Sequence, residues 1–344
     1  MRLTIRTDVS DSIGAGHFVR CLALADRAAA QGGRATFLAH QAHPVIAQAL
    51  AGRVHDLVVL NVPEGASLEH DARASASALD AECDWLVVDH YGLDVRWESS
   101  IRRQALNVLV IDDLADRRHD CDLLVDPGYG RIVADYAGLV PPTAQLLLGT
   151  HFALLKNMFA ERHNAAPLPS DDRRIHVFFG SGASAARWLA QYCEWLLDAF
   201  AGIQVCAVGC GEPKAMLALQ QRYGERLEWQ AQVDDMAAHM AACDVAIGGP
   251  GSATWERACV GLPMALVATA ENQVPVLRSL DSARFCRYLG SAWGLDARRF
   301  ATGVADFLAD NNARSDMRAR GVAAVDGRGA DRVLRHLAGH GDRR

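Results

Sequence analysis

Short apolar segments alternate along the chain with longer stretches in which apolar residues recur at helical spacing. The apolar segments have the length and composition of buried β-strands, and they are Leu3–Ile5, Ala35–Leu38, Leu57–Leu60, Trp85–Val88, Val108–Ile111, Ile175–Phe179, Ile203–Val208, Leu227–Trp229, Val245–Ile247 and Met264–Val267. The stretches between them, such as 18–30 and 183–200, carry the helical period. This alternation predicts an α/β protein whose sheets are parallel and are built from right-handed crossover units.

A polar stretch rich in proline and charged residues, at positions 163–174, separates two such series of strands. Its composition is typical of an exposed linker. We therefore expect two Rossmann-like domains that face a cleft, one at residues 1–165 and the other at residues 172–344. The tail after about Gly290 is rich in alanine, arginine and aspartate, and we expect it to be helical.

Composition narrows the class of protein and of partner. The chain has 344 residues, half of them hydrophobic, so it can bury a large core. A formal net charge of −6 argues against a nucleic-acid partner, because proteins that bind DNA or RNA usually carry a basic face. Nine scattered cysteines without a Cys-x-x-Cys pair favour reduced thiols and offer no metal site of zinc spacing. Without a signal sequence or a membrane-length apolar run, we expect a cytoplasmic protein with no membrane partner.

The first candidate site lies where a glycine loop is predicted to turn into a helix. Gly14 and Gly16 follow the first strand, and His17 comes directly after them. Glycines let backbone N–H groups approach a phosphate, and the amino end of a helix adds positive potential. The motif therefore indicates either an anion site with His17 as a base, or an ordinary loop with a solvated histidine.

Polar residues also follow two later strands. Asp89 and His90 come after the fourth predicted strand, and Asp112 and Asp113 after the fifth. Because ligands bind at the carboxyl ends of parallel strands, either Asp89 or His90 can orient His17 within a catalytic site. The alternative is that these carboxylates cap helices or hold turns.

The second half of the chain holds two further glycine loops, each between a predicted strand and a predicted helix. Their residues are Gly180, Ser181 and Gly182 in one loop and Gly251, Ser252 and Ala253 in the other. Close backbone approach and the amino ends of the helices suit both loops to a diphosphate.

Three polar side chains near the second of these loops suit the rest of a nucleotide sugar. Glu256 can accept hydrogen bonds from both hydroxyls of a ribose. The side-chain amides of Asn272 and Gln273 suit sugar hydroxyls. The simpler interpretation is that Glu256 is a first-turn glutamate favoured by the helix dipole, and that Asn272 and Gln273 begin a helix.

Taken in chain order, several motifs resemble the UDP-sugar hydrolase family of pseudaminic acid biosynthesis. They are the segments 14–25, 88–92, 111–113, 136–139, 152–156, 251–257 and 270–273. The resemblance extends from about Leu3 to Gly290, and its several independent motifs make it specific.

This resemblance implies a GT-B fold with UDP held mainly by the second domain. The implied activity is the removal of UDP from UDP-2,4-diacetamido-2,4,6-trideoxy-β-L-altropyranose by water, without a metal or other cofactor. His17 matches the catalytic histidine, and Arg20 and Tyr91 lie in matching motifs and are expected to bind substrate. The loop at 179–184 lacks the acidic residue common in the family. The resemblance therefore supports UDP binding more strongly than it supports the identity of the sugar.

A single base can suffice for such a reaction. UDP is a good leaving group, so cleavage at the anomeric carbon needs little acid assistance. Neutral His17 would take a proton from water attacking the face opposite UDP, which gives inversion, and the amino end of the following helix disfavours the imidazolium. Two alternatives stay open: a GT-B glycosyltransferase that uses a UDP-amino sugar, and a non-catalytic nucleotide-sugar-binding protein.

Overall fold

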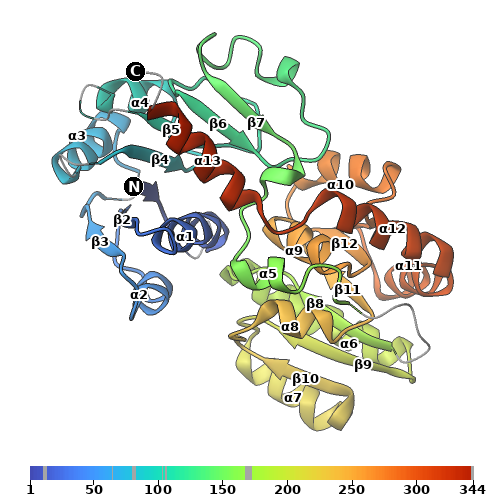
Figure 1. The fold of residues 1–344 in the computed structure, drawn as a ribbon. Coiled ribbons are helices and arrows are strands. Elements are labelled where there is room, and N and C mark those ends of the chain that lie inside the picture. The colour runs from blue at the N-terminus through green and yellow to red at the C-terminus, as the bar shows by residue number, and fades with distance from the viewer. Residues whose placement is uncertain are drawn as a thin grey trace. The chain divides into compact units, whose positions relative to one another are not determined.

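A computed structural model describes residues 1–10, 14–63, 65–79, 83–102, 104, 107–166 and 173–341. The chain forms two compact units, Met1–Asn157 together with Arg328–Arg344, and Met158–Gly327 (Figure 1). Each unit has its own parallel sheet, of seven strands in the first and six in the second among the described residues. The predicted α/β class with two Rossmann-like domains is confirmed.

The first unit contains the seven-stranded sheet. In spatial order its strands are β3 (Asp56–Val59), β2 (Arg34–Ala39), β1 (Arg2–Thr7), β4 (Trp85–Asp89), β5 (Val108–Ile111), β6 (Leu123–Asp126) and β7 (Gln145–Leu148). Its helices are α1 (Gly16–Ala29), α2 (Pro44–Leu50), α3 (Leu68–Ala78), α4 (Val95–Ile101), the short η1 (Val133–Tyr136) and η2 (Thr150–Phe152), and α13 (Gly329–Gly341).

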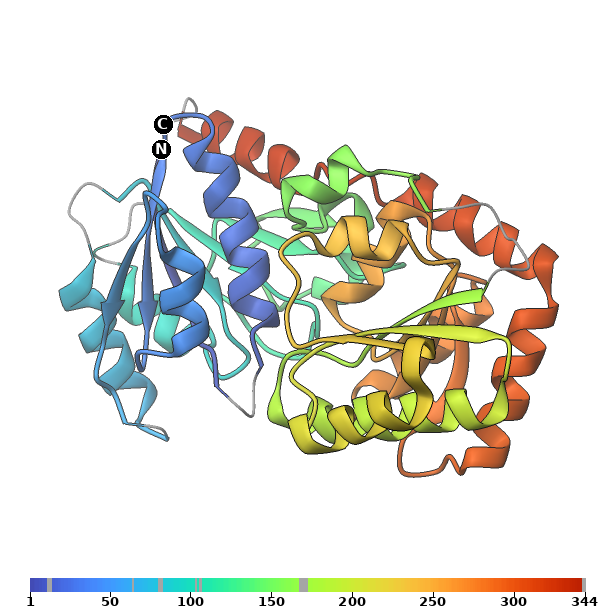
Figure 2. The same cartoon turned by 90° about the horizontal axis from the view of Figure 1, so that it is seen from below.

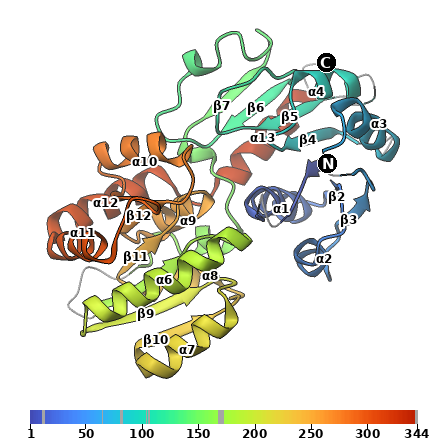
Figure 3. The same cartoon turned by 180° about the vertical axis from the view of Figure 1, so that it is seen from behind.

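Alternate residues of the strands bury opposite faces of this sheet, as the pleat requires. Trp85 and Val87 of β4 belong to a core that includes residues of α1, α2 and α13. Leu86 and Val88 of the same strand belong to a second core with residues of α3 and α4, including Trp97. The sheet is therefore covered on both faces (Figure 3), which explains why its strands are nearly continuous apolar runs.

The second unit contains the six-stranded sheet. In spatial order its strands are β10 (Leu227–Gln230), β9 (Ile203–Val208), β8 (Arg173–Phe178), β11 (Val245–Gly248), β12 (Met264–Ala268) and β13 (Arg287–Ser291). Its helices are α5 (Asn157–Glu161), which begins at the unit boundary, α6 (Ala183–Ala199), α7 (Pro213–Tyr223), η3 (Gly224–Arg226), α8 (Met236–Ala241), α9 (Ser252–Val260), α10 (Gln273–Ser282), α11 (Ala297–Ala309) and α12 (Asn311–Ala324). Residues of α6, α7 and α11 share one core with the sheet, and Figure 2 shows α6 and α7 side by side along the strands.

Both sheets have a point where the strand order reverses. In the first unit the chain moves outward from β1 to β3 and then returns to add β4 on the other side of β1. In the second unit β11 is added beside β8 in the same way. Loops that leave neighbouring strands in opposite directions open a crevice at the carboxyl ends of these strands, where ligands of open α/β sheets bind.

The structure differs from the predicted second domain of 172–344 at the final helix of the chain. Helix α13 belongs to the first unit, because Val333, Leu334 and Leu337 are buried in the same core as Phe18 of α1. Arg27 of α1 also forms a salt bridge with Asp331 of α13. The apolar face of α13 therefore covers the first sheet.

The predicted linker at 163–174 also differs in part from the structure. The chain passes into the second unit already after Asn157. The backbone N–H groups of Asn164 and Ala166 donate to Cys259 and Val260 at the end of α9 (3.0 and 2.8 Å). The first part of the predicted linker is therefore attached to the second unit, and its residues 167–172 lie outside the described residues.

Candidate active site

The candidate site in the first unit is built around a hydrogen bond between His17 and Asp89. His17 is the second residue of α1, and Asp89 is the last residue of β4. The imidazole Nδ1 donates to Asp89 Oδ1 over 2.6 Å. Because an ionised carboxylate only accepts hydrogen bonds, this contact places the proton on Nδ1 and leaves Nε2 as the basic nitrogen.

Arg20 holds the same carboxylate from one turn further along α1. Its Nε donates to Asp89 Oδ2 and its Nη2 to Oδ1, both over 2.6 Å. Burial acts to raise the pKa of Asp89, but the charge of Arg20 and the hydrogen bonds from Arg20 and His17 outweigh it and hold this pKa below its usual range. Asp89 is therefore an ionised, fully buried acceptor that fixes the imidazole of His17.

Arg20 was expected to bind substrate, and its surroundings argue otherwise. Its third contact is from Nη1 to Asp113 Oδ2 (2.7 Å), and its side chain is buried. Two carboxylates thus occupy the guanidinium. Arg20 is placed to position Asp89 rather than to contact a ligand.

Tyr91 packs against the imidazole of His17. Its ring meets that of His17 edge-to-face, with 4.5 Å between the centroids and an interplanar angle of 88°. Its hydroxyl donates to Asp113 Oδ1 (2.8 Å), so Asp113 connects Tyr91 to Arg20. Tyr91 is 43% exposed whereas His17 is 9% exposed. Tyr91 is thus the part of this group that faces solvent in the first unit.

Of the two residues expected to orient His17, Asp89 makes the contact. His90 belongs to a neighbouring group instead: its Nδ1 accepts the N–H of Gly92 (3.0 Å), and its Nε2 lies 3.4 Å from Asp8 Oδ2. Burial, together with the charge of Arg6, lowers the pKa of His90 to about 4. His90 is therefore a neutral imidazole whose Nδ1 accepts a hydrogen bond and whose Nε2 lies near Asp8.

The alternative role of a turn-holding carboxylate fits Asp112. Its Oδ2 accepts the N–H of Ala115, and its Oδ1 accepts Arg117 Nη1, both over 2.9 Å. The hydroxyl of Tyr136 lies between two carboxylates, 2.9 Å from Asp112 Oδ2 and 2.7 Å from Asp126 Oδ2. Asp113, which the sequence did not single out from its neighbour, is the one that reaches Arg20.

The glycine loop before α1 is described only in part, since residues 11–13 lie outside the described residues. Gly14 has a φ of 75°, a conformation that favours glycine, and its N–H donates to Ser10 O (2.8 Å). Gly16 begins α1, whose N-cap residue Ala15 provides no side-chain hydrogen bond. The amino end of α1 therefore lies at the same sheet edge as His17.

In the second unit both predicted glycine loops lie at the switch point between β8 and β11. Gly180 has a φ of 118°, and Gly182 is the N-cap residue of α6. Gly251, with a φ of 98°, is the N-cap residue of α9, so Ser252 and Ala253 are its first helical residues. Neither cap residue provides a side-chain hydrogen bond.

The remaining candidates in the second unit have different surroundings. Glu256 lies on α9, one turn from its start. Asn272 is an exposed residue at the start of α10. Gln273 Oε1 accepts the N–H groups of Thr269 and Ala270 (2.8 and 3.2 Å), so this side-chain oxygen holds the loop after β12.

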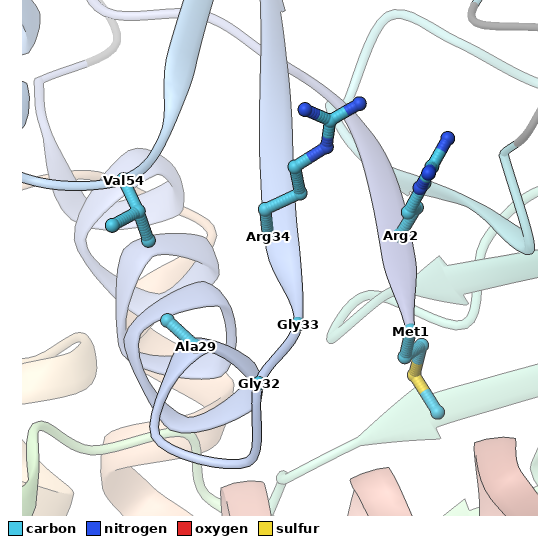
Figure 4. A pocket seen from close by; sticks show the side chains of 7 residues that line it. All are labelled: Met1, Arg2, Ala29, Gly32, Gly33, Arg34 and Val54. Carbon is cyan, nitrogen blue, oxygen red and sulfur yellow. The ribbon is translucent and has the colours of Figure 1, made fainter.

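A pocket of about 600 Å³ in the first unit lies at the other edge of the sheet. Figure 4 shows its lining residues, which include Arg2 at the start of β1 and Arg34 at the start of β2. Ligands of parallel sheets bind at the carboxyl edge, so this pocket does not belong to the candidate site.

Among the described residues no group of three or more His, Cys, Asp or Glu side chains is arranged to hold a metal ion. Among the same residues, no helix combines the length and apolarity needed to cross a lipid bilayer.

Comparisons with known proteins add a partial sequence relationship. No protein-family model matches the chain. Over 160 residues the chain is 27% identical to the UDP-2,4-diacetamido-2,4,6-trideoxy-beta-L-altropyranose hydrolase of Campylobacter jejuni, which is 46% of this chain and 53% of that enzyme. The chain thus matches about half the length of this curated relative.

Solved structures match over almost the whole chain. MurG of Acinetobacter baumannii has a TM-score of 0.67 at 12% identity, over 98% of this chain and 99% of that one. CalG4, the calicheamicin glycosyltransferase, has a TM-score of 0.60 at 16% identity, over 98% of each chain. UDP-GlcNAc 2-epimerase of Neisseria meningitidis, bound to UDP-GlcNAc, has a TM-score of 0.65 at 10% identity, over 98% and 100%. The chain has the GT-B fold of these proteins, and it is a distant relative of the Campylobacter jejuni UDP-sugar hydrolase.

Proposed function

We propose that this chain is a hydrolase that releases UDP from UDP-2,4-diacetamido-2,4,6-trideoxy-β-L-altropyranose by attack of water at the anomeric carbon. The observation that carries the proposal is the 2.6 Å contact of His17 Nδ1 with the buried carboxylate of Asp89, at the carboxyl edge of the first sheet. The partial identity to the Campylobacter jejuni enzyme supports both the reaction and the sugar.

In the proposed reaction His17 is the general base. Its Nε2 takes a proton from water while the water oxygen forms a bond to the anomeric carbon. The bond from this carbon to the oxygen of the β-phosphate breaks, its electron pair leaves with UDP, and the sugar is released with inverted configuration. Ionised Asp89 stabilises the imidazolium that forms, and a general base of this kind accelerates a reaction by about a hundredfold to ten-thousandfold.

We assign UDP to the second unit. Backbone N–H groups of the loops at Gly180–Gly182 and Gly251–Ala253 would donate hydrogen bonds to the diphosphate. The N-cap residues of both following helices leave first-turn N–H groups without a side-chain cap. Glu256 would accept the ribose hydroxyls, and Asn272 and Gln273 would contact polar groups of the substrate. In the first unit Gly14, Gly16 and Tyr91 would line the sugar side of the reaction, with His90 as a neutral neighbour.

The experiment is to incubate the purified protein with this UDP-sugar, without any acceptor, in the presence and absence of a chelator. Proton NMR would follow the anomeric signal while free UDP is measured in the same sample. We expect UDP and free sugar of inverted configuration to appear at equal rates with and without chelator. Release only after an acceptor alcohol is added would identify a glycosyltransferase, and binding without release a nucleotide-sugar-binding protein.

A further inference from the structure

Arg257 of α9 is a fully buried cation that the proposed reaction does not use. Its side chain is 0% exposed. Nη1 donates to Gly249 O (2.8 Å) and Nη2 to Phe178 O (2.9 Å), while Nε has no hydrogen-bond partner. Two backbone carbonyls are thus the hydrogen-bond acceptors of this guanidinium.

Among the described residues Arg257 forms no salt bridge with a carboxylate. Glu256 is the nearby negative charge that favours the charged form of Arg257. Burial lowers the pKa of Arg257 to about 10, so the group stays charged at neutral pH. A buried charge without a salt-bridge partner is costly, and an anionic ligand would relieve that cost.

The position of the guanidinium connects it to both glycine loops. Phe178 ends β8 and Gly249 follows β11, so the two carbonyls directly precede the loops proposed to hold the diphosphate. The fit is close: a Cβ on Gly248 would lie 1.9 Å from Phe178 O and 2.7 Å from Arg257 Nη2. Turning these carbonyls toward Arg257 fixes the peptide planes at which the loops begin.

A second observation points to a ligand at the same helix end. The hydroxyl of Thr254, in the first turn of α9, is buried and has no hydrogen-bond partner. The N-cap residue Gly251 provides no side-chain acceptor for this turn. Two polar groups without hydrogen-bond partners, the Thr254 hydroxyl and Arg257 Nε, therefore occur together near the start of α9.

We propose that Arg257 is a positioning residue that fixes the two glycine loops and supplies the positive charge that makes them select a diphosphate over a neutral nucleoside. This inference rests on the assignment of UDP to the second unit. It predicts that the contribution of Arg257 to binding affinity increases with the negative charge of the ligand, from uridine through UMP to UDP.

The test compares Arg257→Met with Arg314→Met. Arg314 is a suitable control because it is also a buried arginine of the second unit that donates to backbone carbonyls, those of Phe307 and Leu308, but it lies on α12. Binding of UDP and UMP would be measured by calorimetry, and binding of uridine by ligand-observed NMR. We expect Arg257→Met to weaken UDP binding at least about tenfold and uridine binding less than about threefold. Arg314→Met should change neither affinity, and Arg257→Lys should restore most of the UDP affinity.

An equal loss for UDP and uridine in Arg257→Met would show that Arg257 only supports the fold of the loops, and unchanged UDP affinity would show that it has no role; either result overturns the inference. If Arg257→Met does not fold, NMR of the guanidinium Nε–H in the unmodified protein decides the question. This signal should shift on addition of UDP and not on addition of uridine, and equal responses would overturn the inference. Binding with this charge dependence but no hydrolysis of the UDP-sugar would remove only the proposed function.

Discussion

Replacing His17 with asparagine tests the base without removing the group that Asp89 requires. The asparagine amide can donate to Asp89 Oδ1 in place of Nδ1, and Arg20 still donates to both oxygens of Asp89. The main structural loss is the edge-to-face contact with Tyr91, which is worth about 1 kcal/mol. The melting temperature should therefore fall by only about 2–4 °C.

The catalytic loss should be much larger. Without Nε2 no group takes the proton of the attacking water, so kcat should fall by about 10²–10⁴, which corresponds to about 3–5 kcal/mol of transition-state stabilisation. KM should change by less than about threefold, because UDP is held elsewhere. The assay is initial-rate release of UDP over a range of substrate concentrations.

His55→Asn is the matched control for this variant. His55 is also a buried histidine of the first unit that contacts an aspartate, with 3.2 Å between its Nε2 and Asp26 Oδ1, but it precedes β3 at the amino edge of the sheet. We expect it to keep the unmodified kcat. A kcat of His17→Asn within tenfold of the unmodified protein would refute the general-base assignment.

Asp89→Asn should lower kcat by at least a hundredfold and destabilise the first unit by about 3 kcal/mol, because it removes the carboxylate that Arg20 and His17 share. Equal turnover, or an unchanged midpoint in urea unfolding, would contradict this prediction. Glu256→Ala should raise the Kd for UDP in calorimetry and leave kcat at saturating substrate nearly unchanged, and unaltered UDP affinity would remove Glu256 from the ribose site. Burial raises the pKa of Asp126 to about 6, so its stabilising contribution is present below about pH 4 and is lost as the pH rises through 6. The stability of Asp126→Asn relative to the unmodified protein should therefore rise by up to about 3 kcal/mol between pH 4 and pH 7; parallel stability profiles in chemical denaturation would reject this shift.

Much of the candidate site in the first unit could be predicted from the sequence, because the apolar runs indicate where the strands end. The apolar run Trp85–Val88 predicts a strand, and Asp89 follows it at the edge where ligands bind. What the sequence left open was whether Asp89 or His90 orients His17. Spacing could not decide this, because both residues follow the same strand and successive side chains point to opposite faces of a sheet.

Other features depend on tertiary packing that no local pattern encodes. The helical period of the tail predicts a helix near α13, but it does not say which sheet its apolar face covers. Strands β7 (Gln145–Leu148) and β13 (Arg287–Ser291) were missed, and the residues of β13 include few apolar side chains. Arg20 lies three residues after His17 and so on the same face of α1, which is a signal that could have identified it as a positioning residue. Arg257 carries no such signal, because its burial depends on the close approach of β8 and β11 at Gly248.

The most direct test of the account is the fate of the solvent oxygen. The reaction would be run in water enriched in ¹⁸O, and the UDP released would be examined by mass spectrometry, since its phosphate oxygens do not exchange with water under these conditions. Attack at the anomeric carbon predicts that UDP carries no ¹⁸O and that the label enters the sugar. One ¹⁸O atom on the β-phosphate of UDP would place the attack at phosphorus and contradict the role proposed for His17.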